Sequence, residues 1–237
     1  MRNRYFIIED REDKSGYTFW RDFLKALFPD IVLMSGGNSS ELVKFVGKIQ
    51  ESDDEYYIVL DDSFDNQQTT MEWARVTRIA RNMKNVHLID FACFEYILLQ
   101  FQELDSWVFA EEDELKQKRR DLLTVRENFL HAVDKGIGVN GSIYEIHQYA
   151  VKWNCHNIEQ FSAKLLFDIT RNTGFEVSKS KLGPCWHISC CEWDDRQEDD
   201  ICGLDKRRID LTEKMRQIYR ETSIRKEFIK NGIEDSI

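Results

Sequence analysis

The chain has 237 residues, a formal net charge of −10 at pH 7 and 12% aromatic residues. This length suffices for one large domain or two small ones, and the aromatic content argues against an intrinsically disordered chain. The acidic charge argues against an architectural nucleic-acid-binding protein, whose affinity comes from a basic surface, but not against a metal-dependent enzyme that acts on nucleic acid. Charges begin at Arg2 and no apolar run reaches the length of a membrane span, so we expect a cytoplasmic protein without a signal peptide.

The first hundred residues alternate between apolar strands and amphipathic helices. The predicted strands are 4–8, 31–34, 56–60 and 85–90, and the predicted helices are 17–28, 41–49, 69–82 and 94–99. Ser39 or Ser40 is expected to cap the second of these helices. Such alternation is typical of an α/β fold of the Rossmann type, a parallel sheet flanked by helices with right-handed crossovers.

The sequence pattern changes after about residue 104. We therefore divide the chain into an α/β domain, residues 1–104, and a mainly helical C-terminal region, residues 105–237, with a cysteine-rich segment. Helices are predicted there at 111–133, 142–151, 157–170 and 210–230. The segment 174–202 has no clear period and is expected to be irregular.

Acidic residues cluster directly after the first and third predicted strands. They are Glu9, Asp10, Asp13, Asp61, Asp62 and Asp65. The carboxyl ends of parallel strands form the edge where open α/β sheets bind ligands. Carboxylates that converge there cannot all stay ionised without a partner, and the usual partner is a hard divalent cation such as Mg²⁺ or Mn²⁺. The alternative is that these acids only form turns and cap helices.

Several short segments resemble the Toprim domain, the metal-binding fold of topoisomerases, bacterial primases and OLD-type nucleases. Segment 6–14 (FIIEDREDK) resembles its first strand and acidic motif, segment 36–38 (GGN) its second turn, and segment 59–65 (VLDDSFD) its Asp-x-Asp motif. Segment 94–99 (FEYILL) resembles solo-Toprim nucleases found beside ABC-type ATPases in anti-phage systems. Two departures matter: Asp10 replaces the usual Gly, and Ser63 stands where the second acid of the Asp-x-Asp motif belongs.

The resemblance covers about residues 4–100 and implies an Mg²⁺- or Mn²⁺-dependent endonuclease. It also implies a toxin-like effector of antiviral defence that a partner ABC-type ATPase keeps inactive. The substrate would be DNA or RNA, including tRNA. The implied catalytic residues are Glu9, Asp61 and Asp65, and the implied metal ligands are Glu9, Asp13, Asp61, Asp62, Asp65 and Glu95. Because serine is a poor cation ligand, Ser63 leaves two outcomes open: Asp62 or Asp65 substitutes, or the site has lost metal affinity. Asp13 and Glu95 also suit the simpler role of acids at helix N-termini.

Lys14, Arg207 and Arg208 are candidates for binding the substrate phosphates. The alternatives are a plain ion pair for Lys14 and a solvated, internally paired helix face for the basic residues from Lys206 to Lys226.

Six cysteines without a signal sequence favour free thiols or metal ligands over disulfides. A structural Zn²⁺ could be held by Cys185, His187, Cys190 or Cys191, and Cys202. The spacing lacks the paired Cys-x-x-Cys pattern, so buried free cysteines are the favoured interpretation, and Cys93 and Cys155 are expected in the core.

Two other functions stay open. Ser63 and the acidic charge suit a catalytically degenerate Toprim domain that acts as an interaction or regulatory subunit. A receiver-like signalling domain would use Glu9, Asp10 and a phosphorylated Asp61, but it also needs a fifth strand that ends in lysine, which the sequence does not show. A homo-oligomer is compatible with the sequence, which does not decide the oligomeric state.

Overall fold

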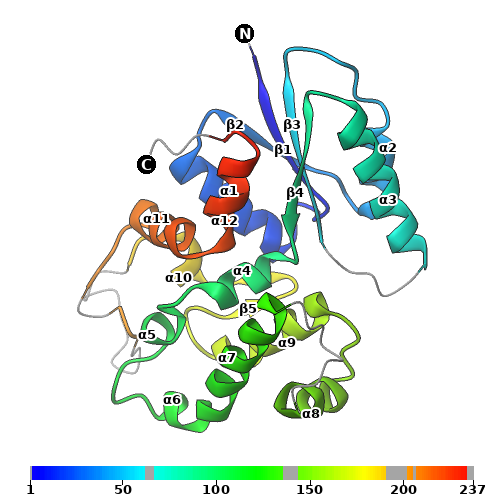
Figure 1. The fold of residues 1–237 in the computed structure, drawn as a ribbon. Coiled ribbons are helices and arrows are strands. Elements are labelled where there is room, and N and C mark those ends of the chain that lie inside the picture. The colour runs from blue at the N-terminus through cyan, green and yellow to red at the C-terminus, as the bar shows by residue number, and fades with distance from the viewer. Residues whose placement is uncertain (1, 62–66, 136–143, 191–201, 205–206, 234–237) are drawn as a thin grey trace.

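The computed structural model describes residues 2–61, 67–135, 144–190, 202–204 and 207–233 (Figure 1). Four parallel strands form the central sheet in the order β2-β1-β3-β4. The strands are β1 (Arg4–Ile8), β2 (Ile31–Ser35), β3 (Glu55–Asp61) and β4 (Val86–Phe91). The α/β fold of the Rossmann type and its parallel sheet are thereby confirmed.

The helices between the strands cover both faces of the sheet, as Figure 1 shows. They are α1 (Ser15–Leu27), α2 (Ser39–Val46) and α3 (Gln67–Asn82), and α4 (Phe94–Gln100) follows the last strand. Alternate residues of each strand face opposite layers: Ile7 and Ile58 pack with α2 and α3, while Phe6 and Val59 pack with α1. The inner residues of the two central strands, Phe6–Ile8 of β1 and Tyr57–Leu60 of β3, are apolar because both faces of the sheet are buried there.

The C-terminal region is mainly helical and shares the core on the α1 face of the sheet. Its elements are α5 (Leu104–Val108), α6 (Glu114–Lys118), α7 (Arg120–Asp134), α8 (Tyr144–Trp153), α9 (Ile158–Thr170), β5 (Val177–Ser178), β6 (Lys181–Leu182), α10 (Pro184–His187), α11 (Leu211–Glu221) and α12 (Ser223–Lys230). Trp20 of α1 stacks on Phe91 of β4 at 5.5 Å and on Phe228 of α12 at 6.4 Å between ring centroids. One apolar core therefore joins the two ends of the chain, and the division at residue 104 stays a prediction.

Two predicted helices are each broken into a pair. The helix predicted at 111–133 is interrupted at Arg119, whose buried guanidinium donates to the carbonyls of Ile169 and Arg171. The helix predicted at 210–230 is interrupted at Thr222, and the next residue, Ser223, donates from its backbone N–H and its hydroxyl to the Gln100 side-chain oxygen at 3.1 and 2.7 Å. In both cases tertiary contacts override a continuous helical period.

Two smaller predictions were also wrong. The cap of α2 is Asn38, whose side chain accepts from the Glu41 N–H at 3.0 Å, and not Ser39 or Ser40. The segment predicted to be irregular contains the antiparallel β5–β6 hairpin and the short helix α10.

In the described part of the chain, no helix has the length and apolar character that a membrane span requires.

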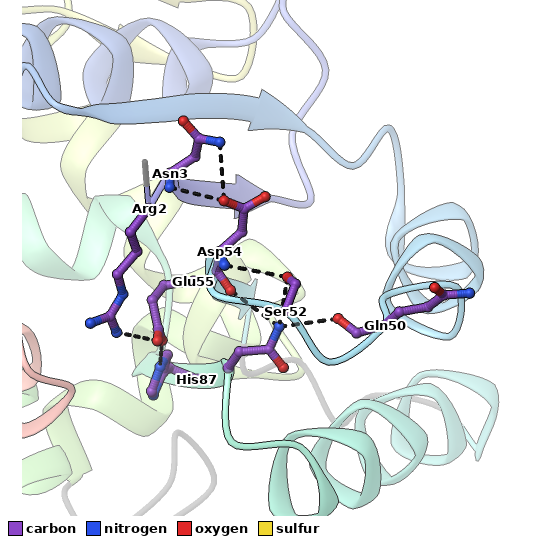
Figure 2. Close-up of polar contacts among 8 residues, drawn as sticks. Arg2, Asn3, Gln50, Ser52, Asp54, Glu55 and His87 are labelled. Atoms are coloured by element: carbon purple, nitrogen blue, oxygen red, sulfur yellow. Dashed lines mark hydrogen bonds and ion pairs between the residues drawn. The ribbon is translucent and has the colours of Figure 1, made fainter.

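Polar side chains hold the amino ends of the strands together, as Figure 2 shows. Buried Glu55 at the start of β3 contacts Arg2 and His87, and the Asp54 carboxylate accepts from the backbone and side chain of Asn3. The Asn85 amide donates to the carbonyls of Gln50 and Asp54. These contacts fix the register at the edge opposite the predicted acidic site.

Arg126 is a buried cation that is expected to contribute strongly to stability. Its guanidinium donates to the carbonyls of Leu99 at 2.8 Å and Phe101 at 2.5 Å, where α4 ends. Arg126→Met removes both donors from a buried site, so the free energy of unfolding should fall by about 2–4 kcal/mol in urea denaturation. Arg120→Met, an exposed change on the same helix, should shift it by less than about 0.5 kcal/mol. Equal shifts in the two variants would contradict this role.

Candidate functional site

The strand register brings the acidic residues that follow β1 and those that end β3 to one edge of the sheet. Ile8, the last residue of β1, pairs with Val59, and β3 continues for two residues to Asp61. Glu9 follows Ile8 directly, and its carboxylate accepts a hydrogen bond from the Asp61 backbone N–H. The predicted convergence of Glu9 and Asp61 is therefore what the fold produces.

Two further carboxylates reach this edge from helices. Glu95 lies in the first turn of α4, which begins three residues after β4 ends. Glu159 lies in the first turn of α9, which Asn157 caps by accepting from the Gln160 N–H at 2.8 Å. The charge of Glu159 raises the pKa of Glu9, Asp10, Asp61 and Glu95, so Glu159 lies close enough to act electrostatically on all four. We call these five residues, Glu9, Asp10, Asp61, Glu95 and Glu159, the acid cluster.

Packing of α9 against its helical neighbours explains why Glu159 arrives there. The Phe161 ring lies 4.6 Å from that of Phe129 on α7, and Phe129 lies edge-on to Tyr96 of α4 at 5.8 Å. Phe161 is completely buried and sits two residues after Glu159. The apolar face of α9 thus sets the position of its acidic first turn.

Asp10 reaches the cluster because α1 has a glycine near its start. A Cβ on Gly16 would lie 2.0 Å from the Asp10 Oδ2 atom. The carboxylate therefore occupies space that any other residue at position 16 would fill. Lys14 and Lys179 lie close enough to Asp10 that their charges lower its pKa.

Burial and mutual repulsion raise the pKa of every cluster member for which a shift is resolved. Burial raises the pKa of Glu9 to about 7, with further increases from the charges of Glu159 and Asp10. Burial and the charge of Glu159 likewise raise the pKa of Asp10 to about 6. Both carboxyls therefore titrate near neutral pH.

The deeper members are shifted further. Burial raises the pKa of Glu95 to about 8, and burial with the charges of Glu159 and Glu9 raises that of Asp61 well above its ordinary range. The adjacent Cys93 is fully buried, caps α4 by accepting from the Tyr96 N–H at 3.4 Å, and has a pKa raised by burial. The charges with the largest influence on Glu9, Asp61 and Glu95 are all negative, whereas Lys14 and Lys179 act on Asp10.

The donor chemistry of the acid cluster fits a hard divalent cation. All its side-chain donors are carboxylate oxygens, which Mg²⁺ and Mn²⁺ prefer, and its members are partly exposed at a sheet edge that a ligand can reach. Within the described ranges, however, no three His, Cys, Asp or Glu side chains form a compact metal-binding group. Asp62 and Asp65, both predicted ligands, lie outside the described residues, as does Ser63.

The remaining predicted site residues lie at the margin or away from the cluster. Asp13 is exposed and pairs with Lys14 at 3.3 Å, and this is the plain ion pair considered from the sequence. Arg207 pairs with Glu103 at 3.6 Å and donates to Ser106 beside α5. Arg208 is exposed, with a backbone φ of 39°. The structure therefore brings Lys14, but neither arginine, into contact with the charges around Asp10.

The predicted zinc ligands do not gather in the described part of the chain. Cys185 lies against Gly174, His187 lies 3.8 Å from the Asp22 carboxylate, and the backbone N–H of Cys190 donates to Ile209. Cys202 lines a separate hollow beside Ser106, and Cys191 is outside the described residues. Zinc binding stays a prediction, whereas Cys93 and Cys155 are buried as expected.

The sequence analysis placed Asp10 in the acidic cluster but not among the implied metal ligands, and it missed Glu159. Asp10 had a signal, because it adjoins Glu9 at the strand end and its side chain alternates to the α1 face. Glu159 had none: an acid in the first turn of a capped helix is ordinary, and 63 residues separate it from Glu95 along the chain.

Comparison of the chain with known protein families, with curated proteins and with solved structures finds no match.

The acid cluster should make the metal-free protein less stable as pH rises. A carboxyl whose pKa is raised on folding holds its proton better in the folded state. Its contribution to the free energy of unfolding is therefore full below about pH 4.5 and is lost as pH rises to 7–8. For Glu9 alone this amounts to about 3 kcal/mol. Urea denaturation in EDTA should show this fall, and Glu95→Gln should reduce it. The exposed Glu41→Gln should behave like the wild type, and a flat wild-type profile would contradict the raised pKa values.

Proposed function

We propose that the protein is a divalent-metal-dependent nuclease whose active site is the acid cluster. The observation that carries this proposal is the convergence of five carboxylates from β1, β3, α4 and α9 on the carboxyl edge of a parallel sheet. Burial of several like charges is costly unless a cation compensates them. A cation held there would suit a phosphodiester substrate, because both are bound at such edges in open α/β sheets.

The cluster residues fall into two roles. Asp61 and Glu9, joined by the hydrogen bond from the Asp61 N–H to the Glu9 carboxylate, would hold the cation, Mg²⁺ or Mn²⁺, with Asp10 and Glu159 adding negative charge. When bound, the cation would supply Lewis acidity and activate water for phosphodiester hydrolysis. Glu95, whose pKa is about 8, carries a proton at neutral pH and is suited to donate it to the leaving oxygen.

Two lysines at the margin would attract the substrate. Lys14 and Lys179 both act on the charge of Asp10, so positive charge lies next to the cluster in a chain whose net charge is −10. Lysine ammonium groups next to the cluster would bind the phosphates that flank the scissile bond.

The resemblance to Toprim nucleases supports the finer parts of the proposal. It alone suggests a role in antiviral defence and control by a partner ABC-type ATPase. The absence of a compact metal-binding group within the described residues favours a second candidate, a Toprim-like regulatory subunit without catalysis. A receiver-like domain is less favoured, because β4 is the last strand on its side of the sheet in the described chain.

Cleavage assays distinguish a nuclease from a regulatory subunit. With Mg²⁺ or Mn²⁺, the wild type should cut at least one of supercoiled DNA, single-stranded DNA and total RNA. Glu9→Gln and Asp61→Asn should each lower the rate at least about 100-fold, because they remove charge from the cation site. Glu41→Gln, an exposed change on α2, should cut at the wild-type rate. Activity that is equal in all four proteins, or absent from the wild type, would refute the proposal.

Metal binding should release protons. Glu9 and Asp10, whose pKa values are about 7 and about 6, must deprotonate for the site to hold a cation, so Mg²⁺ affinity should rise between pH 6 and pH 8. Isothermal titration calorimetry in two buffers of different ionisation enthalpy measures the released protons directly. Asp61→Asn should weaken binding at least about tenfold. Affinity that is independent of pH would place the cation elsewhere.

A further inference from the structure

A second hollow of about 460 Å³ adjoins the acid cluster. It lies between the end of α8, the outer face of α9 and the tip of the β5–β6 hairpin. The residues that shape it are Trp153, Asn154, Gln160, Lys164, Phe167 and Lys179. This volume falls within the range of about 300–1,000 Å³ typical of pockets for small organic groups.

The hairpin connects this hollow to the acid cluster. The Ser15 hydroxyl, at the start of α1, donates to the Lys179 carbonyl at 3.3 Å. The next residue, Gly16, is the one against which the Asp10 carboxylate lies. On the other side of the hollow, Gln160 directly follows Glu159 of the cluster. The two sites therefore share both a hairpin and the first turn of α9.

The lining combines apolar rings with positive charge. Trp153 and Phe167 are partly exposed aromatic residues, and the Lys164 ammonium lies 5.4 Å from the centre of the Phe167 ring while it pairs with Asp168 at 3.4 Å. Lys179 is exposed at the hairpin tip. Aromatic rings beside lysines are the combination with which proteins hold unpaired nucleotides: the rings contact the base and the lysines contact the phosphates.

Amide groups add hydrogen-bonding capacity at the rim. The side-chain amide oxygen of Gln160 accepts from the backbone N–H of His156 at 2.9 Å, and this bond orients the amide. Asn154 has a left-handed backbone, with φ of 54°, where α8 ends. Both residues line the hollow and can pair with the edge of a base.

We propose that this hollow binds one nucleotide of an unpaired strand, so that an adjoining phosphodiester lies at the acid cluster. This inference rests on the proposed nuclease function and narrows its substrate to single-stranded or looped nucleic acid. A base in a duplex is stacked on both faces and cannot enter such a hollow without leaving the helix.

Binding of labelled oligonucleotides tests the proposal without cleavage. Fluorescence anisotropy with Ca²⁺ in place of Mg²⁺ would compare a single-stranded oligonucleotide with the duplex of the same sequence, in DNA and RNA versions. The wild type should prefer the single strand. The double variant Lys164→Ala/Lys179→Ala should bind about tenfold more weakly, and the slope of log affinity against log salt should fall by about 1.4, because each lost phosphate contact contributes about 0.7.

The matched control is Lys152→Ala/Lys181→Ala. It removes the same amount of charge, from α8 and from the β5–β6 hairpin, but Lys152 lies over the Tyr149 ring, Lys181 pairs with Glu176, and neither lines the hollow. Its affinity and salt slope should match the wild type. Trp153→Leu should weaken single-strand binding at least about fivefold while the salt slope is unchanged, because it removes base contact but no charge. Its thermal midpoint should be measured alongside to confirm folding.

The outcomes separate this inference from the proposed function. Equal weakening in the two double variants, preference for the duplex, or binding of a free mononucleotide as tightly as of the strand would overturn the nucleotide hollow, even where cleavage depends on Glu9. Loss of binding specific to Lys164 and Lys179 in a protein that cuts nothing would support the hollow and refute the nuclease.

Discussion

Parallel pairing of β1 with β3 places the ends of two central strands side by side, and both strands end in carboxylates. Apolar packing enforces this arrangement, because Ile7, Ile8, Ile58 and Val59 are buried within the sheet layers. The same core brings α4 and α9 against the strand ends and carries Glu95 and Glu159 with them. Hydrophobic contacts elsewhere in the core thus hold like charges together, and burial with their mutual repulsion raises their pKa values.

This arrangement costs stability that the core offsets. The opposite edge of the same sheet differs, because there the buried Glu55 contacts Arg2 and His87. At the carboxyl edge the strongest charges that act on Glu9 and Asp61 are negative, and this contrast is consistent with the proposed cation site. Local rules of stability are commonly broken at functional sites.

The distribution of positive charge supports the same conclusion. The chain is strongly acidic, yet Lys14, Lys164 and Lys179 lie around the cluster and the adjoining hollow. Lys179 takes part in both, since it acts on Asp10 and lines the hollow. A polyanion repelled by most of this surface would be attracted to one region of it, which is how acidic proteins can still direct nucleic acid to a site.

Periodicity in the sequence determined the α/β half of the fold: all four strands and their connecting helices were predicted to within three residues, and with them the convergence of Glu9 and Asp61. The apolar runs and the apolar–polar alternation that predict strands span only a few residues, so the local sequence carries that information. Only the tertiary structure decided that Asp10 fits against Gly16, that Arg119 and Thr222 divide two helices, and that Glu159, Lys164 and Lys179 join the site. These outcomes depend on contacts between segments far apart in the chain, such as α9 with α4 and the β5–β6 hairpin with α1, and no local pattern encodes which distant surface a helix will meet.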